Sequence, residues 1–176
     1  MTFETIIKSN FLHLRRTIKD DLDFVITTEQ QPENKKYITS WTIDKHLEAL
    51  CSRDHLHLII ESNNLKIGYI ILSGLSNPNN CVELTRINIS AKGKGHGKES
   101  IKLIQEFVFN HLKAHRLWLD VKEHNERAKH VYEVTGFKPE GILRECIQTE
   151  GEYESLIIMG ILEKEYRDIE GDRDFT

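Results

Sequence analysis

Apolar residues along this chain recur with two different periods, which together predict a single domain that mixes helices and strands. Spacings of three and four residues, as at Ile18, Leu22 and Val25, are typical of one face of a helix. Alternation of apolar and polar residues, as at 11–15, indicates a half-buried strand. The whole pattern predicts strands over 11–15, 56–61, 66–75, 81–89, 116–121, 137–148 and 153–162, and helices over 18–29, 43–50, 98–112 and 126–135.

Short polar signals mark the ends of several of these elements. Ser62-Asn63-Asn64 separates two strand patterns and predicts a hairpin. Ser40 or Thr42 is placed to cap the second helix, and Asn125 to cap the last one. Gly136 follows that last helix, where a glycine is the preferred residue because the chain turns left-handed there.

The strand that ends at Ile89 changes phase partway along. Val82 and Leu84 are its first apolar pair, but strict alternation then fails, because the next apolar residues are Ile87 and Ile89. One extra residue near Thr85-Arg86 restores a continuous apolar face, which predicts a β-bulge. This strand and the one after the following helix form a βαβ unit and are therefore expected to be parallel, and the bulge is expected to splay them apart.

A glycine-rich loop follows this strand: Lys92-Gly93-Lys94-Gly95-His96-Gly97-Lys98, with a helix expected from about Lys98. Alternating glycines leave backbone N–H groups uncovered, and the start of a helix adds further unpaired N–H groups and the positive end of its dipole. Arg86 and three lysines of the loop add positive charge, and no acid lies between them. These features predict a cradle for a phosphate-bearing ligand, most simply a diphosphate.

Two familiar phosphate loops do not fit this spacing. A P-loop has four residues between its glycines, whereas Gly93 and Gly97 enclose three, and Glu99 occupies the position of the hydroxyl that binds Mg²⁺. The dinucleotide fingerprint is G-x-G-x-x-G, and this run is G-x-G-x-G. A flexible connection without any ligand is the structural alternative.

Composition narrows the classes of protein that remain. The chain has 176 residues, of which 39% are hydrophobic and 30% charged, as expected for one ordinary globular domain. Its net charge of −4 argues against general nucleic-acid binding. Cys51, Cys81 and Cys146 are odd in number and far apart, which favours a reducing cytoplasm over a disulfide framework. No signal peptide or membrane-spanning run is recognisable, so no membrane partner is expected.

Three motifs together resemble the GNAT superfamily of N-acetyltransferases. The loop resembles its [Arg/Gln]-x-x-Gly-x-[Gly/Ala] signature, with Lys92 replacing the usual Arg or Gln. Residues 125–137 are similar to its N-x-x-A-x-x-x-Y-x-x-x-G-F segment. Residues 139–144 and 151–154 look like the final hairpin of the branch with ribosomal-protein alanine and spermidine N-acetyltransferases, with Glu154 where many members have Asp.

The resemblance covers about residues 9–165 and implies an α/β (α+β) GNAT fold. This is a mixed, mostly antiparallel sheet of about seven strands with a parallel, splayed central pair and about four flanking helices. It implies a domain over 1–165 and a charged, peripheral tail over 166–176. The expected activity is N-acetyl transfer, in which acetyl-CoA is the co-substrate, the acetyl group passes directly to the amine, and no metal takes part. The acceptor is a small-molecule amine, polyamine-like, or a peptide N-terminus, and a homodimer is compatible with the branch.

The resemblance also assigns residues to the site. Tyr132 is the expected general acid, with a core aromatic residue as the alternative, and Asn125 serves pantetheine, the helix cap or both. Glu83, on the strand face opposite Val82 and Leu84, is a candidate base acting directly or through water. The residues expected to bind acetyl-CoA are Ile87, Asn88, Ile89, Lys92, Gly93, Lys94, Gly95, His96, Gly97, Lys98, Asn125 and Tyr132.

Other polar residues receive plainer roles. Glu29 and Glu33 are also weighed as bases near the acceptor site, although a surface carboxylate is the simpler expectation, and Asp120 is expected to serve structure. His55 with His57 and His111 with His115 have no carboxylate in a metal-binding frame, so solvated histidines are expected. A non-catalytic CoA-binding or regulatory module and a nucleotide-phosphate binder remain the competing functions.

Overall fold

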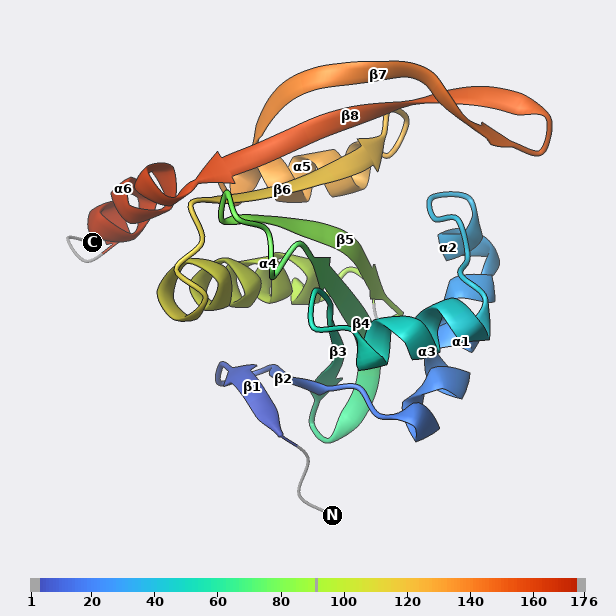
Figure 1. Ribbon diagram of the computed structural model, residues 1–176, viewed down its shortest axis with the longest axis horizontal. Helices are drawn as coiled ribbons and strands as arrows, with labels where there is room; N and C mark the ends of the chain where they lie inside the picture. The colour runs from blue at the N-terminus through green and yellow to red at the C-terminus, as the bar shows by residue number, and fades with distance from the viewer. Residues whose placement is uncertain (1–3, 91, 174–176) are drawn as a thin grey trace.

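The computed structural model describes residues 4–90 and 92–173, and within them one sheet of eight strands is flanked by helices (Figure 1). The strand order is β1-β2-β3-β4-β5-β6-β8-β7, and β5–β6 is the parallel pair. The strands are β1 Thr5–Lys8, β2 His13–Arg16, β3 Leu56–Ser62, β4 Leu65–Ser73, β5 Cys81–Ile89, β6 Arg116–Lys122, β7 Lys138–Thr149 and β8 Glu152–Leu162. The helical elements are η1 Lys19–Asp21, α1 Leu22–Gln30, α2 Pro32–Lys35, α3 Ile43–Cys51, α4 His96–Glu106, η2 Phe107–His111, α5 Glu126–Val134 and α6 Glu163–Arg173.

The predicted fold class is confirmed, with three additional elements among the described residues. These are the edge strand β1, the short helix α2 in what was expected to be a polar break, and α6. Helix α4 begins at His96, two residues before the predicted start, because Gly95 already acts as its N-cap. The glycine loop and the first helical turn therefore overlap.

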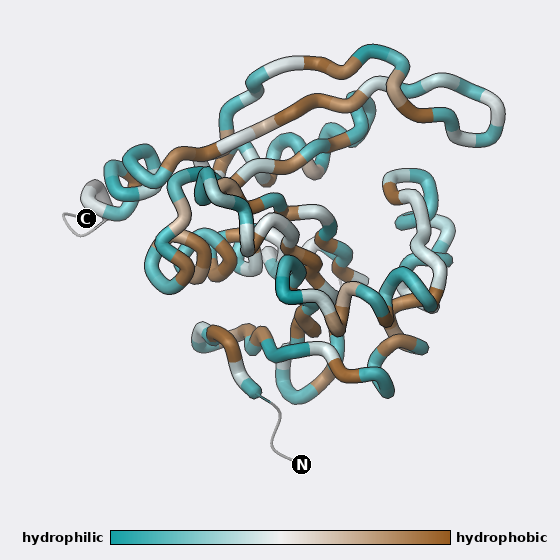
Figure 2. The backbone as a smooth tube through the Cα atoms, in the orientation of Figure 1, coloured by the Kyte–Doolittle hydropathy of each residue, from teal (hydrophilic) through white to brown (hydrophobic). Residues whose placement is uncertain are grey.

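The sheet buries a different core on each face. The larger core lies against α4, η2 and α5 and includes Leu58, Ile70, Leu84 and Ile104. The smaller core lies against α1 and is formed by Val25, Ile59, Tyr69 and Ile71. Figure 2 shows the corresponding hydrophobic stretches along α4 and the central strands. Since β3 and β4 supply residues to both cores, their apolar runs are nearly continuous, as expected for strands buried on both faces.

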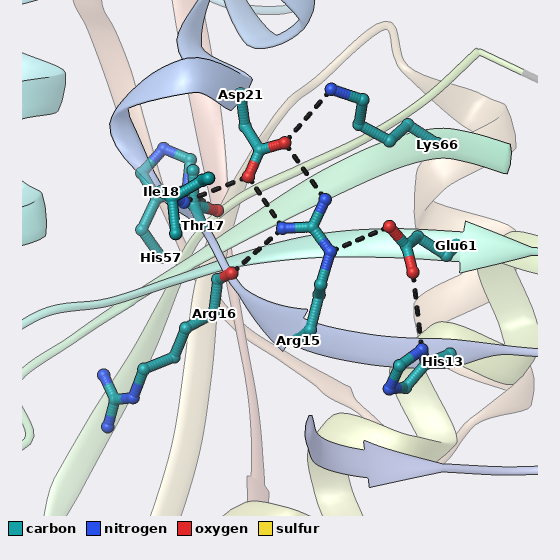
Figure 3. A network of polar contacts seen from close by, with 9 residues as sticks. All are labelled: His13, Arg15, Arg16, Thr17, Ile18, Asp21, His57, Glu61 and Lys66. Carbon is teal, nitrogen blue, oxygen red and sulfur yellow. Dashed lines mark hydrogen bonds and ion pairs between the residues drawn. The ribbon is translucent and has the colours of Figure 1, made fainter. Parts of the chain in front are cut away.

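A buried ion-pair network fastens β2 to the turn before α1 (Figure 3). Arg15 Nη1 and Nη2 donate to the two carboxylate oxygens of Asp21 at 2.7 and 3.0 Å, and Arg15 Nε donates to Glu61 at 2.8 Å. Burial raises the pKa of Asp21, but hydrogen bonds from Arg15, the Ile18 N–H and Lys66 outweigh it and lower that pKa to about 2. The start of α1 is thereby fixed relative to the sheet.

The predicted caps and turns are present. Thr42, not Ser40, caps α3, because its Oγ1 accepts from Lys45 N at 3.3 Å. The hairpin between β3 and β4 turns through Asn63 and Asn64 at φ of 51° and 63°. Such left-handed pairs match the twist of the flanking strands, which explains the asparagines.

The bulge predicted in β5 is confirmed at Thr85. Ile71 of β4 pairs with Arg86 and Leu72 with Leu84, so Thr85 is the additional residue. Beyond it, Ile87 and Ile89 return to the larger core, as the apolar pattern predicted.

The divergence of β5 from β6 is also confirmed. Pairing between the two strands ends at Glu83 and Trp118, and the strands separate beyond that point (Figure 1). This divergence of β5 from β6 after Glu83 leaves the outer edge of Ile87 and Ile89 without a β6 partner.

Residues 166–173 of the expected peripheral tail belong instead to α6, and residues 174–176 lie outside the described part of the chain. Tyr166 is 4% exposed, belongs to the larger core and stacks on Phe109 with ring centroids 4.9 Å apart. Ile169 packs against the same core, so two apolar contacts among many charges help to dock the helix, and the charge count alone concealed them. No helix of the described residues has both the length and the apolar character that crossing a membrane requires.

Candidate active site

The glycine loop forms an open turn at the start of α4. Gly93 and Gly95 have φ of 83° and 78°, a left-handed conformation that favours glycine, and a Cβ at either position meets no atom within 4 Å. Gly97 has an ordinary backbone, and a Cβ there lies 3.9 Å from Ile89 Cδ1. The first N–H groups of α4, from His96 onward, have no intrahelical acceptor. The loop therefore presents uncovered amides next to the diverging end of β5.

The charges around this turn suit an anion. Within the described residues, Lys94 and Lys98 make no ion pair, and both are exposed. His96 Nδ1 is buried without a hydrogen-bond partner in the described chain. Lys92 turns instead toward Glu33, with Nζ 3.3 Å from the Glu33 carbonyl oxygen and 3.8 Å from its carboxylate. The loop residues thus fit a phosphate-bearing group, with Lys92 shared between the loop and α2.

The diverging edge of β5 carries the residues predicted to contact pantetheine. Ile87, Asn88 and Ile89 pair with β4 on one side and lie past the last β6 pair on the other. Asn88 is buried, and its Nδ2 has no hydrogen-bond partner in the described residues. The position of these residues agrees with the predicted role, which stays a prediction.

Tyr132, the expected general acid, lies on α5. Its side chain is 8% exposed and packs in the larger core beside Phe137. Burial, and then the negative charge of Asp120, raise the pKa of the Tyr132 hydroxyl, so it keeps its proton at neutral pH. Asn125 caps the same helix through Oδ1, which accepts from Ala128 N at 3.2 Å. The capping role of Asn125 is confirmed, and its contact with pantetheine stays a prediction.

Glu83 lies at the last paired position of β5. It is half-buried, and Ser73 Oγ donates to its Oε2 at 3.1 Å. Burial raises the pKa of the Glu83 carboxyl, the Ser73 hydrogen bond opposes this, and the charge of Asp120 adds to the rise. A carboxylate with a raised pKa is better suited to accept a proton near neutral pH.

Glu29, expected at the surface, is instead the centre of a buried network. Its exposed fraction is 1%, and it accepts from Tyr69 Oη and Arg86 Nη1, both at 2.5 Å, and from Trp41 N at 3.0 Å. Its carboxylate is therefore fully engaged, and a role as base is disfavoured. Glu33 is exposed, as expected.

Two buried histidines extend this network. His46 Nε2 lies 3.4 Å from Glu29 Oε1 without a well-directed hydrogen bond. His46 Nδ1 lies 3.2 Å from His57 Nε2, and His57 Nδ1 lies 2.9 Å from Thr17 Oγ1. The expectation of a solvated His57 was wrong. Its position inside the apolar run Leu56–Ile60 is a signal of burial that was available in the sequence.

Three cations hold the segment between α1 and α3, residues 31–42, which we name the crossing segment. Lys92 donates to the Glu33 carbonyl, Lys122 Nζ to the Lys36 carbonyl at 3.0 Å and Arg86 Nη2 to the Thr39 carbonyl at 2.6 Å. These cations come from the loop after β5, the end of β6 and the β5 bulge, so the crossing segment contacts both diverging strands. A role for Lys122 was not predicted from the sequence. Its Nζ donates at 2.6 Å to Glu154, the residue that was noted in the final hairpin motif.

No group of three His, Cys, Asp or Glu side chains placed to hold a metal ion occurs within 4–90 and 92–173. The expectation of a metal-free reaction stays a prediction.

Several known proteins are similar to this chain in sequence or in structure. The family model for the acetyltransferase (GNAT) domain matches residues 12–138. The spermidine N(1)-acetyltransferase of Escherichia coli (strain K12) is 30% identical over 125 residues, covering 70% of this chain and 65% of that protein. This chain therefore spans slightly under two thirds of the length of that relative.

The spermidine N(1)-acetyltransferase of Vibrio cholerae serotype O1 is 26% identical over 168 residues, covering 88% of this chain and 95% of that protein. A crystal structure of the spermidine N-acetyltransferase from Vibrio cholerae in complex with CoA and spermine superposes with a TM-score of 0.81 at 25% identity. It covers 90% of this chain and 99% of that chain.

Proposed function

The chain belongs to the GNAT family of acetyltransferase domains, and we propose that it transfers the acetyl group of acetyl-CoA directly to an amine of a polyamine-like small molecule. The observation that carries this proposal is the uncovered glycine turn at the start of α4, set beside a parallel strand pair that separates after Glu83. A diphosphate at the turn leaves pantetheine free to follow the edge of β5 toward Tyr132.

We place the acceptor amine on the sheet face that carries Glu83, opposite the face of Val82 and Leu84, and call it the acceptor side. A primary amine of pKa near 10.4 is protonated at pH 7, and removing that proton costs about 4–5 kcal/mol. Glu83 lies where β5 leaves β6 and is a candidate base. The neutral amine attacks the thioester carbonyl, and the Tyr132 hydroxyl protonates the departing thiolate. The amine nitrogen loses its second proton as the amide forms.

Two observations support a polyamine acceptor: the activity of two related enzymes, and the negative charge of carboxylates near the strand divergence. The two relatives described above are spermidine acetyltransferases, and the crystal structure of the Vibrio cholerae enzyme contains CoA and spermine. Glu83 and Asp120 place carboxylates on the acceptor side, which suits a substrate with several ammonium groups. A peptide N-terminus, whose α-amine has a pKa near 8 and costs only about 1 kcal/mol to deprotonate, needs less help from a base.

An acetyl-transfer screen tests this proposal. Release of CoA thiol is measured with spermidine, spermine, amino acids, aminoglycosides and peptide N-termini as acceptors, and the product mass is confirmed. Turnover with polyamines supports the proposed acceptor, and preferential turnover with peptides replaces it. CoA binding by calorimetry without turnover of any amine supports a non-catalytic CoA-binding module. ATP binding without CoA binding indicates a nucleotide-phosphate binder.

The cellular setting is part of the same proposal. Cys51, Cys81 and Cys146 are free, which is consistent with work in a reducing cytoplasm. The homodimer stays a prediction, and analytical ultracentrifugation of the purified protein tests it.

A further inference from the structure

Asp120 is a carboxylate without a stabilising partner at the point where β5 and β6 separate. Its side chain is exposed, and among the described residues it makes no hydrogen bond and no ion pair. The structural role expected from the sequence therefore has no contact to support it.

The strand register places Asp120 beside Glu83. The last β5–β6 pair joins Glu83 to Trp118, and paired residues of neighbouring strands point to the same face. Asp120 follows Trp118 by two residues and so shares that face, one step into the divergence. Lys122, the next residue on the face, is already bound to Glu154 at 2.6 Å. Glu83 and Asp120 thus remain as neighbouring carboxylates on the acceptor side.

Asp120 also acts electrostatically on both candidate acid–base groups. Its negative charge raises the pKa of Glu83 and the pKa of Tyr132. Among the described residues, the titratable or charged groups coupled to it are Glu83 and Arg86 of β5 and Tyr132 of α5, and Lys122 follows two residues later on its own strand. Arg86 is turned toward Glu29 and the Thr39 carbonyl, so it does not neutralise Asp120 directly.

We propose that Asp120 takes the proton from the acceptor ammonium, while Glu83 holds the amine beside it. The inference rests on the proposed acetyl transfer. The N–H bond of the ammonium breaks and its proton passes to an Asp120 oxygen. The nitrogen lone pair then forms the C–N bond, and the C–S bond of the thioester breaks. Tyr132 gives its proton to sulfur and regains one from the nitrogen, and Asp120 releases its proton to solvent.

The surroundings of Asp120 suit this role. Protein atoms crowded around the carboxyl raise its pKa, with Arg86 opposing, while the side chain itself stays open to substrate and solvent. A carboxylate held in this state accepts a proton more readily than an ordinary surface aspartate.

The experiment compares Asp120→Asn, Asp120→Ser and Glu83→Gln with Glu123→Gln, which removes one negative charge from the turn after β6. The kcat and KM for spermidine are measured from pH 6.5 to 9.5, with acetyl-CoA affinity from calorimetry and melting temperature as readouts besides activity. If the wild type prefers another amine from the panel, that amine is used.

We expect both Asp120 variants to lose ~10²-fold or more in kcat at pH 7, as for loss of a general base, with acetyl-CoA affinity unchanged. The deficit shrinks as pH rises, because more amine is already neutral in solution. Glu83→Gln raises KM for spermidine more than it lowers kcat, and Glu123→Gln resembles the wild type.

The inference is overturned if the Asp120 variants match Glu123→Gln, or if their deficit is the same at every pH. It is also overturned if Glu83→Gln alone shows the pH-dependent loss of kcat. A wild type that binds CoA but acetylates no amine contradicts the proposed function itself, and the two failures are therefore distinguishable.

Discussion

Arg86 Nη1 lies 2.5 Å from Glu29 Oε1 and joins the bulge of β5 to the end of α1. The same guanidinium donates to the Thr39 carbonyl at 2.6 Å and lies over the Trp41 ring. The bulge thus has two consequences. It turns Ile87 toward the larger core, and it turns Arg86 toward the crossing segment, where the charge finds a buried carboxylate.

Breaking this pair is expected to destabilise the fold. Glu29→Gln or Arg86→Met alone leaves an uncompensated buried charge and lowers the free energy of unfolding by about 3 kcal/mol. The double variant recovers a large part of that loss. Urea unfolding at pH 7 measures all three, with Glu48→Gln, an exposed helix residue, as the matched control. Losses that simply add in the double variant contradict a coupled pair.

Stability is expected to fall with acid in two stages. Burial, and then the charge of His46, lower the pKa of His57 to about 3, whereas an unfolded histidine has a pKa near 6.5. Between these values the unfolded chain binds the additional proton, so the free energy of unfolding falls by about 1.4 kcal/mol per pH unit as pH drops.

Glu29 adds the second stage. Burial raises its pKa, but His46, Arg86 and Tyr69 outweigh this and lower it to about 2. The Glu29 carboxylate contributes its full stabilisation of the fold above its unfolded pKa of about 4.5, and this contribution is lost as pH falls below that value. His57→Gln removes the slope between pH 6.5 and 5, and His115→Gln, at an exposed site, retains it. If the free energy of unfolding of His57→Gln still falls with pH between 6.5 and 5 as in the wild type, another group causes that loss of stability.

The sequence was most informative where a structural choice depends on neighbours along the chain. The break in apolar alternation near Thr85 predicted the bulge and the divergence of β5. The position of Asn125 before an apolar helical pattern predicted that it caps α5. Glycine spacing in residues 92–98 predicted the uncovered turn. Each of these features depends on residues close together in the chain, so the local sequence pattern is enough to predict it.

The buried polar network depends instead on partners far apart in sequence. Glu29 meets Tyr69 and Arg86, which are 40 and 57 residues away. Nothing within α1 distinguishes Glu29 from a surface acid, because its burial comes from the sheet and the crossing segment. The structural role expected for Asp120 lacks a supporting contact, and the sequence could not show this for the complementary reason. Its missing partner becomes visible only when the strands on both sides are in place.

Coenzyme A affinity is expected to depend on Gly97. Replacement by Leu adds a bulky side chain beside Ile89 in the first turn of α4, while helix propensity favours Leu over Gly, so the fold is retained. Losing one charge-assisted hydrogen bond to phosphate is worth about 1.5–3 kcal/mol, or roughly 10- to 100-fold in affinity. Gly171→Leu, at an open helical glycine in α6, is the control.

Calorimetry with CoA, dephospho-CoA and pantetheine completes this test. CoA is expected to bind most tightly, and its advantage is expected to shrink with added salt, because Lys94 and Lys98 are exposed charges. Equal affinity of wild type and a folded Gly97→Leu variant for CoA removes the turn from the binding site. Gly95 is a poorer choice for substitution, since its φ of 78° adds backbone strain to any effect.

Tyr132→Phe is expected to lower kcat by ~10²-fold while leaving acetyl-CoA affinity nearly unchanged. The effect is modest for a general acid because a CoA thiol resembles a cysteine thiol of pKa near 8.5, so its thiolate already leaves tolerably well. Burial raises the pKa of the Tyr132 hydroxyl, so the protonated form persists and no loss of rate from its ionisation is expected below about pH 10.

Tyr166→Phe is the matched control for this prediction. Tyr166 is buried in the same core, but it docks α6 and lies outside the candidate site. If Tyr132 only fills the core, the two variants shift the melting temperature slightly and leave kcat unchanged. If Tyr132 protonates the leaving thiolate, kcat falls in that variant alone. Rapid-quench measurements must show that acetyl transfer limits turnover. An unchanged kcat then leaves positioning by β5 and the glycine turn as the main source of rate.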